Sequence, residues 1–386
     1  MFYNQIMDEM ERLHLLSTHM ALEHDQDCGK QRVLTDYEQQ VFISDAVMPN
    51  GRTLPVLKTL LNSACERNCN YCPFRAGRDF QRVLFKPEEF AKLFMDLYHN
   101  GACQGLFLSS GVLGGGVRTQ DQLLDTADIL RSKLGFRGYI HLKIMPGAEK
   151  DQVLRGMQLA DRVSINLEGP NPTRLARLAP LKKFDEELLT PLYWVEELRR
   201  NLPSYQGWGH RWPSITTQFV VGAVEESDLE LLSVTEQLNR QVRLQRAYYS
   251  AFHPISDTPL AEHAPTPLVR QNRLYEASFL LRDYGFDLEE MPFEPSGNLP
   301  QDEDPKLAWA HANLAQQPID LNRADRLQLL RVPGIGPKGA EAILRARRLN
   351  KLTRLEDLTY LGISTKRAAG FILLNGKRPD FQPRLF

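Results

Sequence analysis

The stretch "VLKTLLNSACERNCNYC" (residues 56–72) joins an apolar, β-rich run to three closely spaced cysteines. Residues 56–62 have the composition of a buried strand. Cys65, Cys69 and Cys72 follow in a C-x3-C-x2-C spacing. Three thiolates in one tight loop can bind three irons of a cubane cluster, which leaves the fourth iron for an exchangeable ligand. The alternative is a zinc site, which requires a fourth donor from elsewhere in the chain.

The run at 56–62 is the first of six β-rich runs that alternate with amphipathic stretches. Repeated strand–helix alternation predicts an α/β fold with a parallel sheet and crossover helices, open or curled toward a barrel. Such barrels keep their chemistry at the carboxyl ends of the strands, which is where the cysteines fall. The other strand-like runs are 105–110, 138–145, 162–168, 216–222 and 247–252, and the helical patterns between them are 87–99, 120–134, 148–159, 185–200 and 227–240.

The composition is that of a globular protein, with 42% hydrophobic and 25% charged residues among 386. No apolar run approaches the roughly 20 residues that span a bilayer, and the acidic, amphipathic first residues do not resemble a secretory signal. Five cysteines, three of them clustered, favour metal chemistry in a reducing compartment over a disulfide framework. We therefore expect a cytoplasmic protein that does not associate with membranes.

The net charge of −1 conceals an uneven distribution. Residues 321–378 contain 13 Lys and Arg against 4 Asp and Glu, a net charge of +9, so that residues 1–320 carry −10. A basic segment beside an acidic body indicates a module that binds a polyanion.

Within the basic segment, residues 320–348 have the pattern of a helix, a "PGIG" turn and a second helix that begins at Pro337. Glycine permits a tight turn with close backbone approach, and the free amides of a helix N-terminus suit a phosphate. A degenerate copy follows at 354–375. The pattern resembles tandem helix-hairpin-helix motifs, which in other proteins grip the DNA backbone without reading sequence; some serve protein contacts instead. The residues expected to bind nucleic acid are Gly334, Ile335, Gly336, Lys338, Arg345, Arg347, Arg348, Lys366 and Arg367.

The cysteine spacing, with Tyr71 just before the last cysteine, resembles the radical S-adenosylmethionine (SAM) superfamily. The resemblance implies a partial (β/α)6 TIM-like barrel and a [4Fe–4S] cluster on Cys65, Cys69 and Cys72. It also implies that SAM chelates the fourth iron and is cleaved reductively to methionine and a 5′-deoxyadenosyl radical. An electron donor such as flavodoxin or ferredoxin would be required.

By the same resemblance, the ends of the later strands contact SAM. "LFLSSGVLGGG" (106–116) takes the place of the superfamily's Gly-Gly-Glu motif but has no glutamate, so only the backbone role is expected. Polar side chains inside a barrel are costly unless paired or functional, which favours a pocket over an outward orientation. The residues expected to bind the cofactor are Tyr71, Ser109, Ser110, Gly111, Lys143, Asn166, Glu168 and Gln218.

Segments such as "GYIHLKIMPG", "ADRVSINLEGPN" and "LLRVPGIG" together resemble a family of DNA modification and repair radical SAM proteins with a C-terminal helix-hairpin-helix domain. The resemblance covers most of residues 55–375, and that family tends to accompany a uracil-DNA-glycosylase-like protein. "HDQDCG" (24–29) resembles an Asp–Cys element of the family. Cys28 is therefore a candidate hydrogen donor, second-cluster ligand or nucleophile, and an inert thiol is the alternative.

The leading hypothesis is a radical SAM enzyme that modifies or repairs DNA held by its C-terminal module, through a reaction that remains unassigned. The alternatives are an enzyme that modifies RNA, a non-catalytic Fe–S protein that binds DNA, and an enzyme for a small molecule or peptide. We expect an N-terminal helical extension (1–50), a radical SAM barrel (51–260), an accessory helix and linker (261–317), an all-α helix-hairpin-helix domain (318–378) and a tail (379–386).

Overall fold

The computed structural model describes residues 7–20, 43–47 and 53–380. These residues form two compact units, one within Met1–Glu226 and Gln237–Pro267 and the other within Ser227–Glu236 and Leu268–Phe386.

Six parallel strands build the first unit, and they lie in the sheet in the order in which they occur in the chain. An antiparallel edge strand, β1 (Ile43–Val47), pairs with the first of them. Side chains from the first and the last parallel strand line the same two cavities, so the sheet curls into a partial barrel. The prediction of a partial (β/α)6 barrel is therefore confirmed. The parallel strands are β2 (Thr53–Leu60), β3 (Gly105–Ser109), β4 (Tyr139–Lys143), β5 (Arg162–Ser164), β6 (Ser214–Val221) and β7 (Arg246–Ala251).

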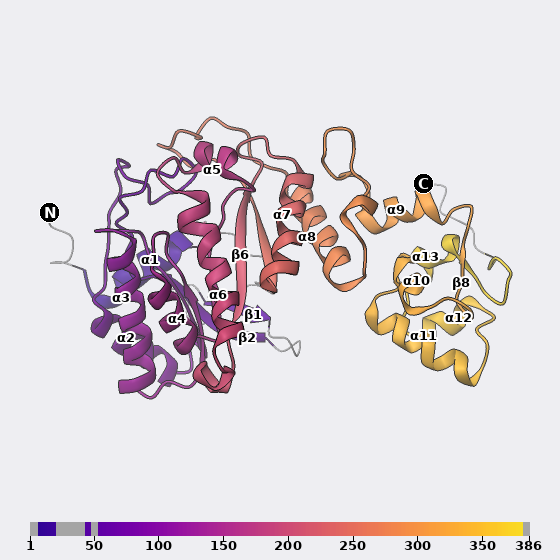
Figure 1. Cartoon of the computed structure of the whole chain (residues 1–386), viewed down its shortest axis with the longest axis horizontal. Coiled ribbons are helices and arrows are strands. Elements are labelled where there is room, and N and C mark those ends of the chain that lie inside the picture. Colours follow the sequence, from indigo (N-terminus) through magenta and orange to yellow (C-terminus); the bar gives the residue numbers. More distant parts are fainter. Residues whose placement is uncertain (1–6, 21–42, 48–52, 381–386) are drawn as a thin grey trace. The chain divides into compact units, whose positions relative to one another are not determined.

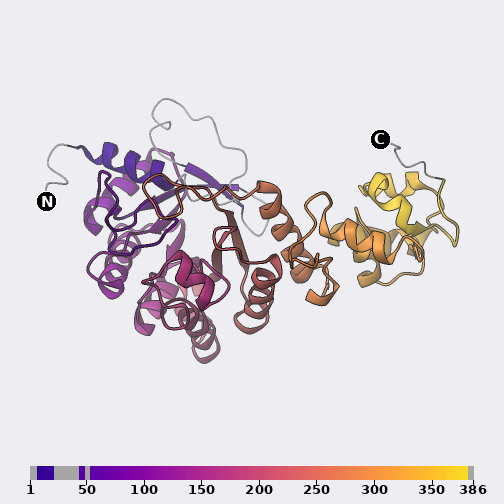
Figure 2. The ribbon, with the colours of Figure 1, turned by 90° about the horizontal axis from the view of Figure 1, so that it is seen from above.

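Helices cover the outer side of this sheet (Figure 1). The helix expected at 87–99 has those bounds, because Pro87 suits a first helical position and Glu88 and Glu89 complement the helix dipole. The first helix packs against β2 and is the indigo helix in Figure 2. The helices of this unit are α1 (Glu9–Met20), α2 (Pro87–His99), α3 (Gly116–Asp128), α4 (Lys150–Leu159), α5 (Pro172–Leu178), α6 (Thr190–Asn201) and the part of α7 (Asp228–Val242) from Gln237 onward, with π-helical turns at Ile129–Lys133 and Phe184–Leu189 and 3-10 turns at Ser204–Gln206 and Trp208–His210.

Strand β5 is shorter than the expected 162–168. The ladder ends at Ser164, and the chain runs on beside β6 through single hydrogen bonds, such as that from Glu168 N to the Gln218 carbonyl (2.9 Å). Glu168 has a φ of +63°, a conformation that costs a non-glycine residue energy and persists where surrounding contacts fix it. The irregular end of β5 therefore places its side chains individually.

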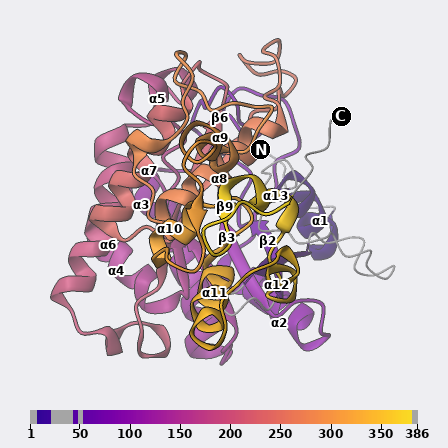
Figure 3. The same cartoon turned by 90° about the vertical axis from the view of Figure 1, so that its right-hand side faces the viewer.

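The second unit is mainly helical (Figure 1, Figure 3). Two strands of two residues each, β8 (Ile319–Asp320) and β9 (Ile372–Leu373), pair in parallel and join the segment that follows residue 318 to the segment that follows residue 371. One apolar core, which includes Leu329, Ile335 and Ile343, holds together the helices from residue 305 onward, and Trp309 and Tyr284 pack against that core. The helices are α8 (Leu268–Asp283), α9 (Pro305–Asn313), α10 (Arg326–Arg331), α11 (Pro337–Leu349), α12 (Leu355–Tyr360) and α13 (Thr365–Ala368), with 3-10 turns at Leu288–Glu290 and Ala369–Phe371.

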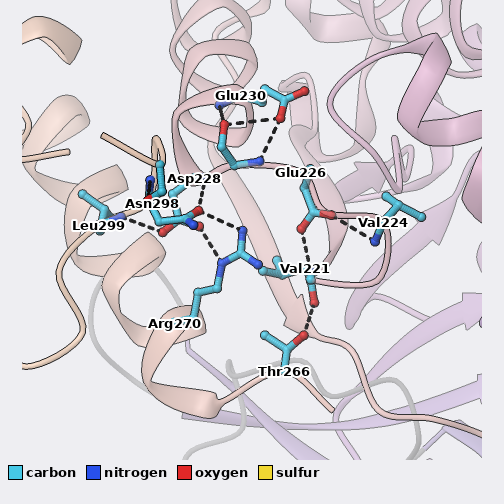
Figure 4. Close-up of polar contacts among 12 residues, drawn as sticks. Val221, Val224, Glu226, Asp228, Glu230, Thr266, Arg270, Asn298 and Leu299 are labelled. Atoms are coloured by element: carbon cyan, nitrogen blue, oxygen red, sulfur yellow. Dashed lines mark hydrogen bonds and ion pairs between the residues drawn. The ribbon is translucent and has the colours of Figure 1, made fainter. Parts of the chain in front are cut away.

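Buried carboxylates fix a loop in each unit (Figure 4). In the first unit, Glu226 accepts hydrogen bonds from the backbone amides of Gly222 and Val224 and so closes the turn after β6. In the second unit, Asp228 accepts from the Arg270 guanidinium (2.8 Å) and from the Leu299 amide (2.9 Å). A buried carboxylate with charged and backbone donors is satisfied, which makes these residues structural.

An aromatic cluster on the barrel exterior gives a test of the packing. The Phe136 ring is 1% exposed and meets Phe94 and Tyr98 edge-to-face, with centroids 5.0 Å away in both cases. We expect Phe136→Ala to lower the free energy of unfolding by about 3–5 kcal/mol, because it leaves a cavity in a rigid core. Urea denaturation measures this, with the 67% exposed Tyr205 as the control: Tyr205→Ala should change stability by less than about 0.5 kcal/mol. Equal losses in the two variants would contradict the packing described.

Candidate active site and nucleic-acid interface

A cavity of about 200 Å³ lies at the carboxyl ends of the barrel strands. Its wall combines strand ends, such as Ser109 of β3 and Lys143 of β4, with the loops that follow them. All three clustered cysteines line this cavity, as do the eight residues expected to bind the cofactor: Tyr71, Ser109, Ser110, Gly111, Lys143, Asn166, Glu168 and Gln218. Five segments that are remote in sequence therefore contribute to one site.

The cysteine loop carries three free thiols. Cys69 is 6% exposed, and Cys65 and Cys72 are half-buried. Backbone bonds from Cys72 N to the Cys69 carbonyl (3.3 Å) and from Asn70 N to the Leu178 carbonyl (2.7 Å) hold the loop in place. The thiols therefore face one cavity from one ordered loop.

Glu66, between the first two cysteines, ties this loop to the glycine-rich loop after β3. Its carboxylate accepts hydrogen bonds from Gly114 N (2.9 Å) and Gly115 N (3.1 Å), and its own amide donates to the Val112 carbonyl (2.7 Å). At Gly111 a Cβ would lie 2.5 Å from the Ala64 carbonyl oxygen, so only glycine allows this approach. The expected backbone role of Ser109–Gly111 is thus compatible with the geometry.

A buried ion pair lies beside the cysteine loop. Lys182 donates to the Glu168 carboxylate at 2.9 Å, and the two side chains are 10% and 6% exposed. Burial alone would raise the pKa of Glu168, but the ammonium groups of Lys182 and Lys143 lower it below its ordinary value. Both groups are therefore charged at neutral pH. Burial and the Glu168 carboxylate raise the pKa of Tyr71 well above its ordinary value, so its hydroxyl remains a donor.

Amide side chains complete the polar part of the wall. Asn166 donates to the Gln218 side chain at 3.3 Å, and the two residues are 9% and 8% exposed. A long bond between two amides leaves further donors and acceptors for a ligand. Gln218 on β6 and Asn166 beyond the end of β5 thus both line the cavity, as the sequence predicted.

Lys182, Arg67 and His253 also line the cavity and were not predicted. Lys182 lies in "PLKKFDEE", where composition alone indicates a solvated charged run. Arg67, within the cysteine motif, pairs with Glu187 at 2.7 Å, and no spacing indicates that partner. His253 follows β7 directly, so the rule that active residues follow barrel strands could have identified it.

The donor set fits an iron–sulfur cluster better than a single ion. Among the residues of 7–20, 43–47 and 53–380, no group of three His, Cys, Asp or Glu side chains is arranged to hold one metal ion. Three thiols that face a 200 Å³ cavity, beside a buried ammonium group, suit a larger, anionic thiolate-bound group. Cys28, the candidate at the barrel mouth, lies outside the described residues.

In the helical unit, the predicted hairpin joins α10 to α11. Gly334 has a φ of +82°, and a Cβ there would lie 2.9 Å from the Ser364 carbonyl oxygen, so the first hairpin packs against the second. Ile335 is buried in the core, and Gly336 caps α11.

The basic residues predicted for this interface separate into two groups. Arg347 donates to the carbonyls of Leu321 (3.0 Å) and Ala324 (2.6 Å), and Arg367 pairs with Asp304. Both guanidinium groups therefore have a partner within the fold. The other four side chains are exposed and have no ion pair or hydrogen bond within the described part of the chain: Lys338, Arg345, Arg348 and Lys366.

Residues 314–368 match the family model described as a helix-hairpin-helix motif, and no curated protein sequence matches the chain. The structure of the FeFe-hydrogenase maturase HydG from Carboxydothermus hydrogenoformans is similar, with a TM-score of 0.45 and 17% identity over 59% of this chain and 51% of that one. Methylornithine synthase gives a TM-score of 0.46 and 13% identity over 59% and 61%. A radical SAM methyltransferase from Sphaerobacter thermophilus gives 0.44 and 14% over 65% and 73%.

The chain spans about half the length of HydG, and at these identities the likeness concerns the fold alone. No helix that the structure describes is long and apolar enough to cross a membrane.

The Glu168–Lys182 pair gives a prediction for the cofactor-free chain. Lys182→Met should lower the free energy of unfolding by about 3–5 kcal/mol, because it leaves a buried carboxylate without its cation. The double variant Glu168→Gln with Lys182→Met should be more stable than Lys182→Met alone, since the uncompensated charge is then gone. Urea denaturation measures these two variants and the single variant Glu168→Gln. A double variant that loses the sum of the single losses would show that the two side chains do not interact.

Proposed function

We propose that this protein is a radical SAM enzyme that modifies or repairs nucleic acid, with DNA as the polymer held by its C-terminal helices. The observation that carries the proposal is the convergence of Cys65, Cys69 and Cys72 with the eight expected cofactor residues on one cavity at the carboxyl end of the barrel. When bound, a [4Fe–4S] cluster with SAM supplies a carbon radical by one-electron cleavage of SAM, for which an external electron donor such as flavodoxin or ferredoxin is needed.

The residues around the cysteines can bind the carboxylate and the ammonium group of an amino acid. The Lys182 ammonium is buried beside Cys69 and Glu168 and offers a cation for a carboxylate. The turn at Ser109–Gly111 lies next to the cysteine loop, and its carbonyl oxygens have a second lone pair that can accept from an ammonium group. The amides of Asn166 and Gln218 can bind hydroxyl groups of a nucleoside.

Apolar side chains exclude water from the rest of the cavity. Phe74, Val112 and Met145 line it and are at most 5% exposed. A dry wall protects a reactive radical from side reactions. A target base or sugar inside a duplex would have to leave the stack to reach such a cavity, whereas a single-stranded target would not.

The helical unit supplies the case for a nucleic-acid substrate. Its helix-hairpin-helix match, its net charge of +9 over residues 321–378 and the exposed side chains of Lys338, Arg345, Arg348 and Lys366, which are unpaired within the described residues, favour contact with phosphates over sequence readout. RNA is the second polymer to test, because backbone contacts do not exclude it. The uracil-DNA-glycosylase-like partner and a role for Cys28 rest on the family resemblance.

The catalytic proposal predicts that anaerobically reconstituted protein binds about four irons and forms 5′-deoxyadenosine from SAM with dithionite. Cys69→Ala should lose the iron and this product. Cys103→Ala is the matched control: Cys103 is buried, and burial raises the pKa of its thiol to about 12, so the inert thiol can be removed without loss of iron. Iron and sulfide assays with product chromatography measure the outcome. A full cluster without 5′-deoxyadenosine would favour a non-catalytic Fe–S protein.

The binding proposal predicts a change in the salt dependence of affinity. Lys338→Gln, Arg345→Gln, Arg348→Gln and Lys366→Gln should each weaken binding and reduce the slope of log Kd against log salt by up to about 1, because each removes one phosphate contact. Lys150→Gln, an exposed lysine on α4, is the charge-matched control and should leave the slope unchanged. Fluorescence anisotropy with duplex DNA, single-stranded DNA and RNA identifies the polymer. If the slope of log Kd against log salt is unchanged in all four variants, these four side chains do not contact phosphates.

A further inference from the structure

A buried lysine from outside the matched motif holds the first hairpin. Lys306 belongs to α9, whereas the helix-hairpin-helix match begins at residue 314. Its side chain is 8% exposed. Its Nζ donates to the Ile335 carbonyl at 2.6 Å and lies 4.7 Å above the Tyr284 ring. An ammonium group in such a place costs energy unless its contacts compensate.

The bond of Lys306 sets the direction of an amide on the hairpin. All described peptide bonds are trans, so the Ile335 carbonyl and the Gly336 N–H point in opposite directions across one peptide plane. A carbonyl held toward the ammonium therefore turns the Gly336 N–H away from it. Gly336 is the N-cap of the 13-residue helix α11, and its N–H has no acceptor in the described part of the chain.

The surroundings of Lys306 make its charge sensitive to a nearby anion. Burial first, and then the guanidinium groups of Arg367 and Arg331, lower the pKa of Lys306 to about 7, against the opposing effect of Asp304. Tyr284 provides the ring above it. Arg331 pairs with Glu290 and Arg367 with Asp304, so the remaining local charges are balanced.

We propose that Lys306 is a positioning residue for the nucleic-acid backbone: it orients the Ile335–Gly336 peptide so that the Gly336 N–H donates to a phosphate. The residues that precede the matched motif are then part of the binding unit. This inference rests on the proposed binding of nucleic acid, and it assigns a role to a side chain that does not touch the ligand.

This role makes the affinity for nucleic acid depend on pH, and the direction of the change can be derived. A bound phosphate favours the protonated ammonium and so raises the pKa of Lys306 in the complex. Below the free value, near 7, Lys306 is protonated in both states and affinity does not depend on this group. Above it, the free protein loses the proton that the complex retains, so affinity falls as pH rises.

The test uses the full chain and a labelled 20-base-pair DNA duplex, with affinity measured between pH 6 and pH 9 at constant salt. We expect the wild-type Kd to rise about three- to tenfold across this range, the effect of a shift of half to one pKa unit. Lys306→Arg, which keeps the donor without titrating, should bind tightly with a flat profile. Lys306→Met should bind more weakly with a flat profile, and Lys150→Met should match the wild type.

Hydrogen exchange of residues 333–338 in the free protein separates positioning from general stability. Faster exchange confined to this segment in Lys306→Met supports the proposal, while faster exchange throughout α10 to α13 contradicts it. If Lys306→Arg binds DNA with the affinity and the pH profile of the wild type, the role of Lys306 is overturned, whereas the proposed function is not. Failure of the wild type to bind any nucleic acid would overturn the proposed function and this inference together. If Lys306→Met does not fold, the Lys306→Arg profile decides.

Discussion

The candidate active site depends on one constraint: the six strands from β2 through β7 all run in parallel, each paired with its neighbour. Strands that run in one direction must all end at the same edge, so six successive loops meet there. Inward alternation then selects which side chains enter the barrel. On β3 and β4, for example, Ser109 and Lys143 line the cavity at the carboxyl ends of the strands, and Phe107 and His141 line a second cavity inside the barrel. The direction and order of the strands thus determine where the site lies, and no single contact does so.

The curled sheet also determines the electrostatics of the cavity, because it encloses the charged side chains. Inside a curled sheet a charge has little water, so it must find a counter-charge within the wall. Glu168 and Lys182 do so, and their mutual support keeps both ionised next to the thiols. The positive φ of Glu168 fits this interpretation, because backbone strain is retained where local contacts fix a side chain.

Much of this arrangement could be predicted from the sequence, because periodicity and spacing are local. The strand–helix alternation predicted a parallel sheet with crossover helices, and the resemblance carried by the cysteine spacing predicted the partial barrel and the polar residues Asn166 and Gln218 of its cavity. Lys182 could not be found in this way, because its partner is 14 residues away and its own neighbourhood reads as a solvated charged run. The short edge strand β1 and helix α5 were also missed, since segments of five and seven residues carry little periodic signal.

The helical unit shows a different limit of sequence reasoning. Counting basic residues treats every guanidinium as available, yet Arg347 and Arg367 have partners inside the fold. Lys306 lies outside the motif but contacts its hairpin. Availability of a charge is a tertiary property, because it depends on which carbonyls and carboxylates the fold brings near.

The position of Glu66 has a consequence for transplanting the motif. The residues between the cysteines are usually treated as spacers, yet the carboxylate of Glu66 binds two amides of the glycine-rich loop. A designer who grafted only the three cysteines onto another barrel would transfer the thiols without Glu66, whose hydrogen bonds set the distance between the cysteine loop and the loop after β3. In this chain the transferable unit is therefore the pair of loops that Glu66 joins.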